Sequence, residues 1–467
     1  MGPTFRVVEL VRRRRIAVRW WQTAWLAVAL ALIAHSQTVN ADPPDNDPVD
    51  AILTGYDGSD WLEELHADGF LKEHDRRSTD EPRIRLRGRI DTDFLWTSQS
   101  PENKATFGDL GDAAGLRRAR IGVEGHLTPD SRYVAEIDLA SGEVVLRDVY
   151  VGWGELRERG ELRTGHFREP FSLEGATSAN SFAFLERSPI NELDPARNWG
   201  VGYFRCSPGE EATFAVGAFH AGTDSSDIQG GPGSETAITA RATLLPWYES
   251  HGERLMHLGV ALSSRLADEG VVIIKQGTSS PLLDLGDSSS SPFVPKITIP
   301  ANFEQRFNAQ WALVNGPFSM QAEWSGTLID QTGGPPVFYH GSYLSAGYFL
   351  TGGQRRYQPE HGTFGAVTVA RPVLPGLSLE SHDAPRGWGA WEVTARFGYL
   401  DYFDLDAPRG PQGQLVGARL SQSTLGVNWY LAERLRILAD YSLAVPDEPN
   451  TGTSTAHIFS MRLGLFW

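Results

Sequence analysis

The sequence predicts an all-β fold, a transmembrane antiparallel β-barrel of about 16 strands, and three observations lead to it. First, segments of about ten residues alternate between apolar and polar side chains, up to the end of the chain. In the final stretch one face carries Phe459, Met461, Leu463, Leu465 and Trp467. Second, the connections between such segments alternate between short and long. Third, beyond the N-terminal segment no apolar run is long enough for a spanning helix, so only a closed barrel pairs every backbone polar group in lipid.

Residues 1–41 are predicted to be a signal peptide, which implies export. Six arginines precede the apolar stretch from Trp20 to Ala34, and Val39-Asn40-Ala41 offers a small-residue cleavage site. The apolar stretch is short for a transmembrane helix. The alternative is an uncleaved membrane anchor. With a barrel to follow, the predicted location is the cell outer membrane.

Composition agrees with many strands and excludes some partners. The 467 residues include 49 Gly, 28 Pro, 14 Trp, 13 Tyr and 22 Phe, but only four Met. The single cysteine, Cys206, allows no intrachain disulfide. Net charge is −16, and removal of the signal leaves 36 basic and 57 acidic residues, or −21. This balance argues against nucleic acid as a partner.

Two segments follow the signal. Residues 42–82 are predicted to be a polar periplasmic lead-in with a short amphipathic helix near Trp61 and Leu65; a plug and a loosely ordered linker are both open. Residues 83–467 are predicted to form the barrel domain.

The first predicted strand carries an unusual row of charges. One face holds Arg83, Arg85, Arg87, Arg89, Asp91 and Asp93, while the other is mostly apolar. Four arginines on one face are tolerable beside water and carboxylates but costly in a packed core. This strand therefore favours a wet lumen on one side and lipid on the other.

Similar segments follow along the chain. Residues 116–127 and 133–139 read as a hairpin around Thr128-Pro129-Asp130, with both signs of charge on its polar side. Thirteen more strands are predicted at 144–154, 161–167, 200–206, 212–220, 236–246, 254–264, 304–314, 318–327, 340–351, 389–400, 421–430, 434–444 and 456–467.

The lengths of the connections assign the two ends of the barrel. Long connections at 97–115, 168–199, 265–303 and 401–420 would face outward, and short turns would face the periplasm. Residues 352–388 break this rule, because they are long but fall on the short-turn side. Either a strand near 363–370 is miscounted or this is a true periplasmic excursion.

From about residue 84 onward the chain resembles the phosphate-selective porin O and P family of Gram-negative outer membranes. No single motif decides the resemblance; the order and spacing of several carry it. The matching stretches are Arg117–Gly125, Leu146–Val151, Leu162–Glu174, Phe184–Ser188, Gly347–Gly352 with Arg355 and Tyr357, Gly389–Val393 and Leu425–Tyr430.

The resemblance implies a porin for passive diffusion of small anionic solutes, phosphate or polyphosphate among them. It implies a homotrimer in outer-membrane lipid, with the third long loop, about 168–199, folded into the lumen. It also implies an arginine ladder along the channel, which suits a guanidinium that stays charged and offers a flat fork of donors. By alternation, the anion-pathway candidates are Arg85, Arg87, Arg89, Arg118, Arg120, Arg396, Arg434, Arg436 and Arg462, with Arg187 and Arg197 from the loop.

Each of these arginines could instead form an ion pair with a lumen acid such as Asp91, Glu124 or Asp138. Two features depart from the phosphate-selective pattern: the chain has only four lysines, Lys72, Lys104, Lys275 and Lys296, and its net charge is strongly acidic. Both weaken the assignment of phosphate and leave the barrel untouched.

Enzyme signatures are not found in the sequence. It holds no Gly-x-Ser-x-Gly, no His-Glu-x-x-His and no Cys-x-x-Cys, so no catalytic residue, metal or cofactor is predicted. Asp401, Asp404 and Asp406 read as an ordinary solvated loop in preference to a calcium site. Two other functions stay open: an outer-membrane hydrolase built on a barrel, which would use His166 or His220, and a plugged barrel that does not conduct.

Overall fold

A computed structural model describes residues 83–142, 144–157, 160–221, 235–267, 269–274, 293, 297–378, 385–410 and 412–467. They all belong to one compact unit, Ser59–Trp467. The predicted signal peptide (1–41) and lead-in (42–82) lie outside the described residues. None of the helices within the described ranges is long and apolar enough to cross a membrane.

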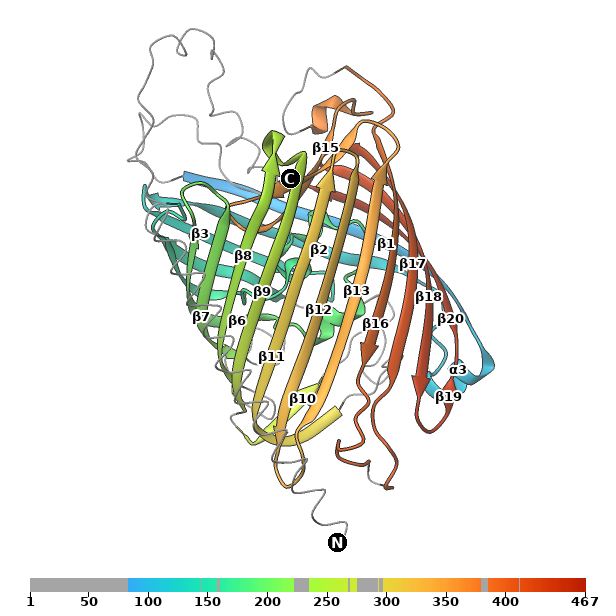
Figure 1. Cartoon of the computed structure of the whole chain (residues 1–467). Helices are drawn as coiled ribbons and strands as arrows, with labels where there is room; N and C mark the ends of the chain where they lie inside the picture. Colours follow the sequence, from blue (N-terminus) through green and yellow to red (C-terminus); the bar gives the residue numbers. More distant parts are fainter. Residues whose placement is uncertain are drawn as a thin grey trace. The chain divides into compact units, whose positions relative to one another are not determined.

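The described residues form a closed antiparallel barrel of sixteen long strands, which confirms the predicted fold class (Figure 1). The wall strands are β1 (Arg83–Gln99), β2 (Ala113–Thr128), β3 (Ser131–Asp138), β4 (Val145–Trp153), β5 (Glu161–Arg168), β6 (Arg197–Cys206), β7 (Ala212–Ala221), β8 (Glu235–Glu249), β9 (Arg254–Ala267), β11 (Ile297–Asn315), β12 (Phe318–Gln331), β13 (Val337–Phe349), β16 (Ala390–Asp401), β17 (Arg419–Ala432), β18 (Leu435–Glu448) and β20 (Ala456–Phe466). The first and last strands, β1 and β20, pair antiparallel and close the barrel.

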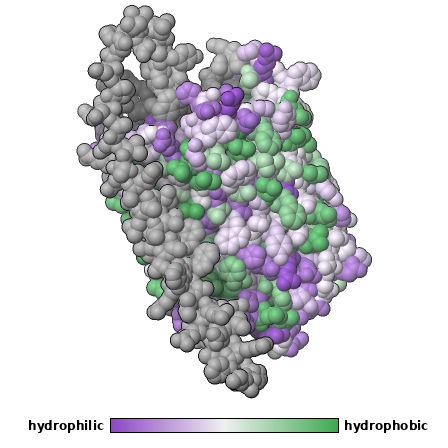
Figure 2. All heavy atoms as spheres, in the orientation of Figure 1, coloured by the Kyte–Doolittle hydropathy of each residue, from purple (hydrophilic) through white to green (hydrophobic). Residues whose placement is uncertain are grey.

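The two faces of β1 separate as the sequence predicts. Ile84 is 76% exposed and Trp96 46%, on the outer face, whereas Asp91 and Asp93 are 1% exposed on the inner face. The final strand behaves alike, with Phe459 and Leu463 exposed and Arg462 buried. Hydrophobic residues are spread over the face of the barrel in Figure 2, as lipid contact requires.

The connections place the two ends of the barrel. Helix α3 (Pro101–Phe107) and two short strands, β10 (Val271–Ile274) and β19 (Gly452–Thr453), belong to the long-loop end. Turns of two residues join β2 to β3, β11 to β12 and β17 to β18 at the other end. Short turns face the periplasm in outer-membrane barrels, so we take that end as periplasmic.

The long connection at 352–388 is a true excursion from the short-turn end. It contains β14 (Gly353–Gln358) and β15 (Thr363–Val369), which pair only with each other in a separate two-stranded sheet. Figure 1 shows β15 at the end of the barrel opposite α3, β10 and β19. Residues 363–369 are therefore not a missing wall strand, and the count of sixteen holds.

An apolar cluster fills part of the interior near the long-loop end. It combines wall residues such as Tyr339 and Ile458 with Val272 of β10 and with Tyr402 from the connection between β16 and β17. Such packing inside a barrel removes water from that part of the lumen, so the space left for a solute lies elsewhere.

Candidate functional site

Residues 169–196 connect β5 to β6, and we call this segment loop L3. A short helix, α4 (Leu173–Ala176), begins after Ser172, whose hydroxyl accepts from the Gly175 amide (2.9 Å). The amides of Leu173 and Glu174 donate to the carboxylate of Glu323 on β12, both at 2.7 Å. A wall carboxylate thus satisfies amides that the first helical turn leaves free. These bonds hold the start of L3 against the inner face of β12.

Three wall arginines bind the middle of L3 through its backbone. Arg436 on β18 donates to the carbonyl oxygens of Ala179 (2.7 Å) and Phe182 (3.1 Å). Arg396 on β16 donates to the Glu186 carbonyl oxygen (2.9 Å), and Arg462 on β20 to that of Leu185. L3 is therefore fastened to the wall formed by β12 to β20.

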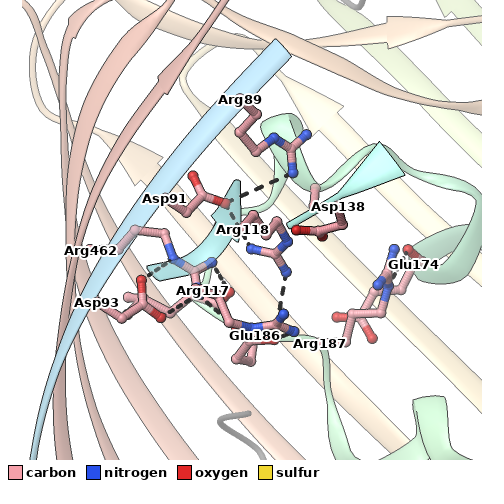
Figure 3. Close-up of polar contacts among 12 residues, drawn as sticks. Arg89, Asp91, Asp93, Arg117, Arg118, Asp138, Glu174, Glu186, Arg187 and Arg462 are labelled. Atoms are coloured by element: carbon pink, nitrogen blue, oxygen red, sulfur yellow. Dashed lines mark hydrogen bonds and ion pairs between the residues drawn. The ribbon is translucent and has the colours of Figure 1, made fainter. Parts of the chain in front are cut away.

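Glu186 is the charged centre of this attachment. Its carboxylate accepts from Arg117 (2.9 Å) and Arg462 (2.6 Å), and Arg118 lies 3.8 Å away. Figure 3 shows the three guanidinium groups around it. Burial on its own would raise the pKa of Glu186, but these arginines hold it well below its usual range. Glu186 is therefore a fixed negative charge that binds L3 to β2 and β20.

On the other side of L3 a cavity of about 430 Å³ remains, bounded mainly by β1 to β8. Thirteen arginines but only four carboxylates line it. The arginines are Arg87, Arg89, Arg117, Arg118, Arg120, Arg132, Arg147, Arg163, Arg168, Arg187, Arg197, Arg205 and Arg241, and the carboxylates are Glu136, Asp148, Glu169 and Glu360. We call this space the arginine cavity.

Many of these arginines form ion pairs with wall acids. The closest pairs are Arg118–Asp91 (2.9 Å), Arg120–Asp138 (2.8 Å), Arg197–Asp148 (2.9 Å), Arg163–Glu161 (3.0 Å) and Arg87–Glu124 (3.2 Å). Ion pairing with a lumen acid, the alternative given for each predicted arginine, therefore applies to many of them. A paired guanidinium keeps donors for a solute but contributes little net charge.

Three arginines of the cavity remain less neutralised by the described acids. Arg89 has its nearest carboxylate oxygen, on Asp91, at 3.9 Å, and its Nε and Nη1 have no hydrogen-bond partner among the described residues. Arg187 bonds backbone carbonyls of L3, and burial lowers its pKa to about 10, so it stays protonated at neutral pH. Arg241 bonds Gln310 and backbone carbonyls. Together they give the cavity its excess positive charge.

The eleven predicted arginines divide into three groups by place. Arg87, Arg89, Arg118, Arg120, Arg187 and Arg197 line the arginine cavity. Arg396, Arg436 and Arg462 bind the backbone of L3. Arg85 and Arg434 do not line the cavity and lie near the periplasmic end, at the start of β1 and in the turn between β17 and β18.

Alternation missed Arg117, which it places on the lipid face. In the pairing of β1 with β2, Asp91 lies opposite Arg118 and Thr92 opposite Leu116, so Arg117 is the extra residue of a β-bulge. The bulge turns Arg117 into the lumen, where it reaches Glu186. An arginine at mid-strand on the lipid face is costly, and that cost is the signal in the sequence that could have revealed the bulge.

Comparisons with known proteins place the chain among porins. The family described as phosphate-selective porin O and P matches residues 84–467. Porin O of Pseudomonas aeruginosa is 25% identical over 405 residues, covering 81% of this chain and 87% of that protein. An uncharacterized protein of Caulobacter vibrioides is 27% identical over 368 residues, covering 77% of this chain and 68% of that one. The outer-membrane channel DcaP of Acinetobacter baumannii aligns at 13% identity and a TM-score of 0.49, over 84% of this chain and 99% of its own.

Proposed function

The chain belongs to the phosphate-selective porin O and P family, and on that premise we propose that it is a passive, anion-preferring channel. The family and the barrel fold make it an outer-membrane porin. The proposal is that small anions cross through the arginine cavity, between L3 and the wall of β1 to β8.

One observation carries the anion preference: thirteen arginines and four carboxylates line the same cavity. Arg89, Arg187 and Arg241 supply positive charge that the described carboxylates neutralise less than that of the paired arginines. The paired arginines add donors without adding much charge, so an anion meets several weak sites in place of one tight one. Conduction needs such weak, successive sites, because a solute has to leave as readily as it enters.

Phosphate and polyphosphate fit the donors of this cavity. Guanidinium groups present parallel N–H donors to two oxygens of one anion, which a lysine cannot do. The four lysines of the chain add little to anion capture. Arginines alone therefore have to provide any discrimination between phosphate and chloride.

The remaining parts of the proposal concern assembly and export. A homotrimer in outer-membrane lipid follows from the family resemblance. Cleavage after residue 41 would remove the signal peptide and leave residues 42–82 as a lead-in before the barrel. N-terminal sequencing of protein from outer membranes is expected to begin at Asp42.

Swelling of proteoliposomes tests whether the barrel conducts at all. Vesicles containing the purified porin are expected to swell in isosmotic solutions of small salts and sugars, and more slowly as solute size rises. Vesicles prepared without protein are the control. Vesicles that do not swell with any solute would instead support a plugged structural barrel.

A further inference from the structure

The hairpin of β14 and β15 enters the lumen from the periplasmic end. Its apolar side packs on the inner wall: Tyr357 and Phe364 cluster with Leu255 of β9 and Val314 of β11. Farther along, Val367 joins a cluster with wall residues of β13, β16 and β17. The hairpin is thus anchored across much of the wall opposite the arginine cavity.

The tip of the hairpin, residues 359–362, crosses to the cavity side. Arg241 of β8 donates to the Gly362 carbonyl oxygen (2.7 Å), and the Glu360 carboxylate accepts from Arg157, in the turn between β4 and β5 (2.7 Å). A Cβ on Gly362 would lie 2.8 Å from the Thr243 hydroxyl, so the backbone packs closely there. Glu360 and His361 both line the arginine cavity. The tip therefore forms part of the periplasmic boundary of the space through which solutes would pass.

Glu360 has to share its counterion with a second acid. The guanidinium of Arg157 pairs with both Glu360 and Glu210, much as that of Arg265 pairs with both Glu169 and Glu235. The carboxylates of Glu360 and Glu210 lie 2.7 and 2.5 Å from the same nitrogen of Arg157. One guanidinium cannot neutralise two carboxylates, so this group carries excess negative charge when both are ionised.

We infer that Glu360 is a specificity-determining residue of the channel, a tethered carboxylate at the periplasmic end of the arginine cavity that limits anion passage. This inference rests on the proposed function. In its ionised form Glu360 repels a solute anion at the exit and offsets the positive charge of nearby arginines such as Arg132. In its neutral form it leaves the field of the arginines unopposed.

The surroundings of Glu360 make its charge, and with it the anion preference of the channel, depend on pH. Burial raises the pKa of Glu360 to about 7; Arg157 opposes this rise, Glu210 adds to it and Arg132 opposes it. His361, next to it, stays neutral over this range, because burial together with Arg132 and Arg163 lowers its pKa to about 3. Glu360 is then largely neutral below pH 7 and charged above it, so anion preference is expected to fall as pH rises through 7.

The test measures reversal potentials of the full-length porin in planar bilayers under a KCl gradient, at about pH 6 and about pH 8. Glu360→Gln is expected to raise the ratio of anion to cation permeability at about pH 8 by roughly threefold to tenfold, and to reduce its pH dependence. Glu210→Gln is the matched control. It removes an acid from the same arginine, but Glu210 does not line the cavity.

The control is expected to shift the pH dependence of selectivity without reducing it. Without Glu210 the pKa of Glu360 falls, so the pH dependence moves to lower pH and is retained. Should Glu360→Gln not fold, Glu360→Ala removes the same charge and is expected to raise the permeability ratio at about pH 8 in the same way. An anion-selective porin whose selectivity at about pH 8 does not change when Glu360 is replaced overturns this inference alone, whereas a cation-selective porin overturns the proposed function with it.

Discussion

Replacing Arg462 with methionine is expected to destabilise the barrel by about 3–5 kcal/mol. The Arg462 side chain is fully buried and bonds both oxygens of Asp93 (2.6 Å each), the Glu186 carboxylate and the Leu185 carbonyl oxygen. Its removal leaves the Asp93 carboxylate buried without its counterion, which costs more than the pair contributed. Urea unfolding of the porin folded into phospholipid vesicles, followed by tryptophan fluorescence, measures the loss.

Arg419→Met provides the matched comparison. Arg419 also pairs with an aspartate, Asp401 (3.1 Å), but its side chain is 44% exposed, so its loss should cost under about 1 kcal/mol. The double change Arg462→Met with Asp93→Asn should recover part of the stability, because no buried charge is left alone. Equal losses for the two single variants would mean that the attachment of L3 through Arg462 contributes nothing special.

Replacing both Arg89 and Arg187 with glutamine is expected to lower anion selectivity by about tenfold or more. Two unit charges about 6 Å apart interact by about 1.4 kcal/mol at an effective dielectric constant of about 40, and about 1.4 kcal/mol is a tenfold change in partition. These two guanidinium groups face the cavity with little neutralisation by the described acids, so their charges act on the solute. The measurement is the ratio of anion to cation permeability in planar bilayers.

The control for this pair is Arg254→Gln, at the start of β9 and outside the cavity, with a side chain 57% exposed. It should leave selectivity unchanged. The effect of the pair should shrink at high salt, because screening shortens the reach of each charge. If selectivity responds to Arg254 as strongly as to the pair, the path does not run along the arginine cavity.

Much of the wall was predictable from alternation, because the chemistry of lipid and water repeats at every second residue. Ile84 and Asp93 already show which face of β1 meets lipid, and the same reasoning placed Arg89 and Arg118 in the lumen. This reasoning did not place Arg117 in the lumen, because a β-bulge adds one residue and reverses the alternation of inward and outward side chains at that point. No periodic pattern contains that information; only the cost of a charge in lipid hints at it.

The contents of the lumen were less predictable, because they depend on contacts between distant segments. Arg396, Arg436 and Arg462 face inward as predicted, yet they bind the backbone of L3, which no count along one strand reveals. The sequence indicated the hairpin of β14 and β15 only as a long connection at the end of the barrel where short turns are expected. Its tip brings Glu360 to Arg157, a partner about 200 residues away in the sequence.

The reversal potential of the unmodified porin under a KCl gradient tests the central claim most directly, since the claim is that anions pass preferentially through the arginine cavity. A single purified preparation in a planar bilayer suffices, and its sign needs no calibration. The potential is expected to lie toward the chloride equilibrium potential. A potential toward that of potassium would contradict the claim.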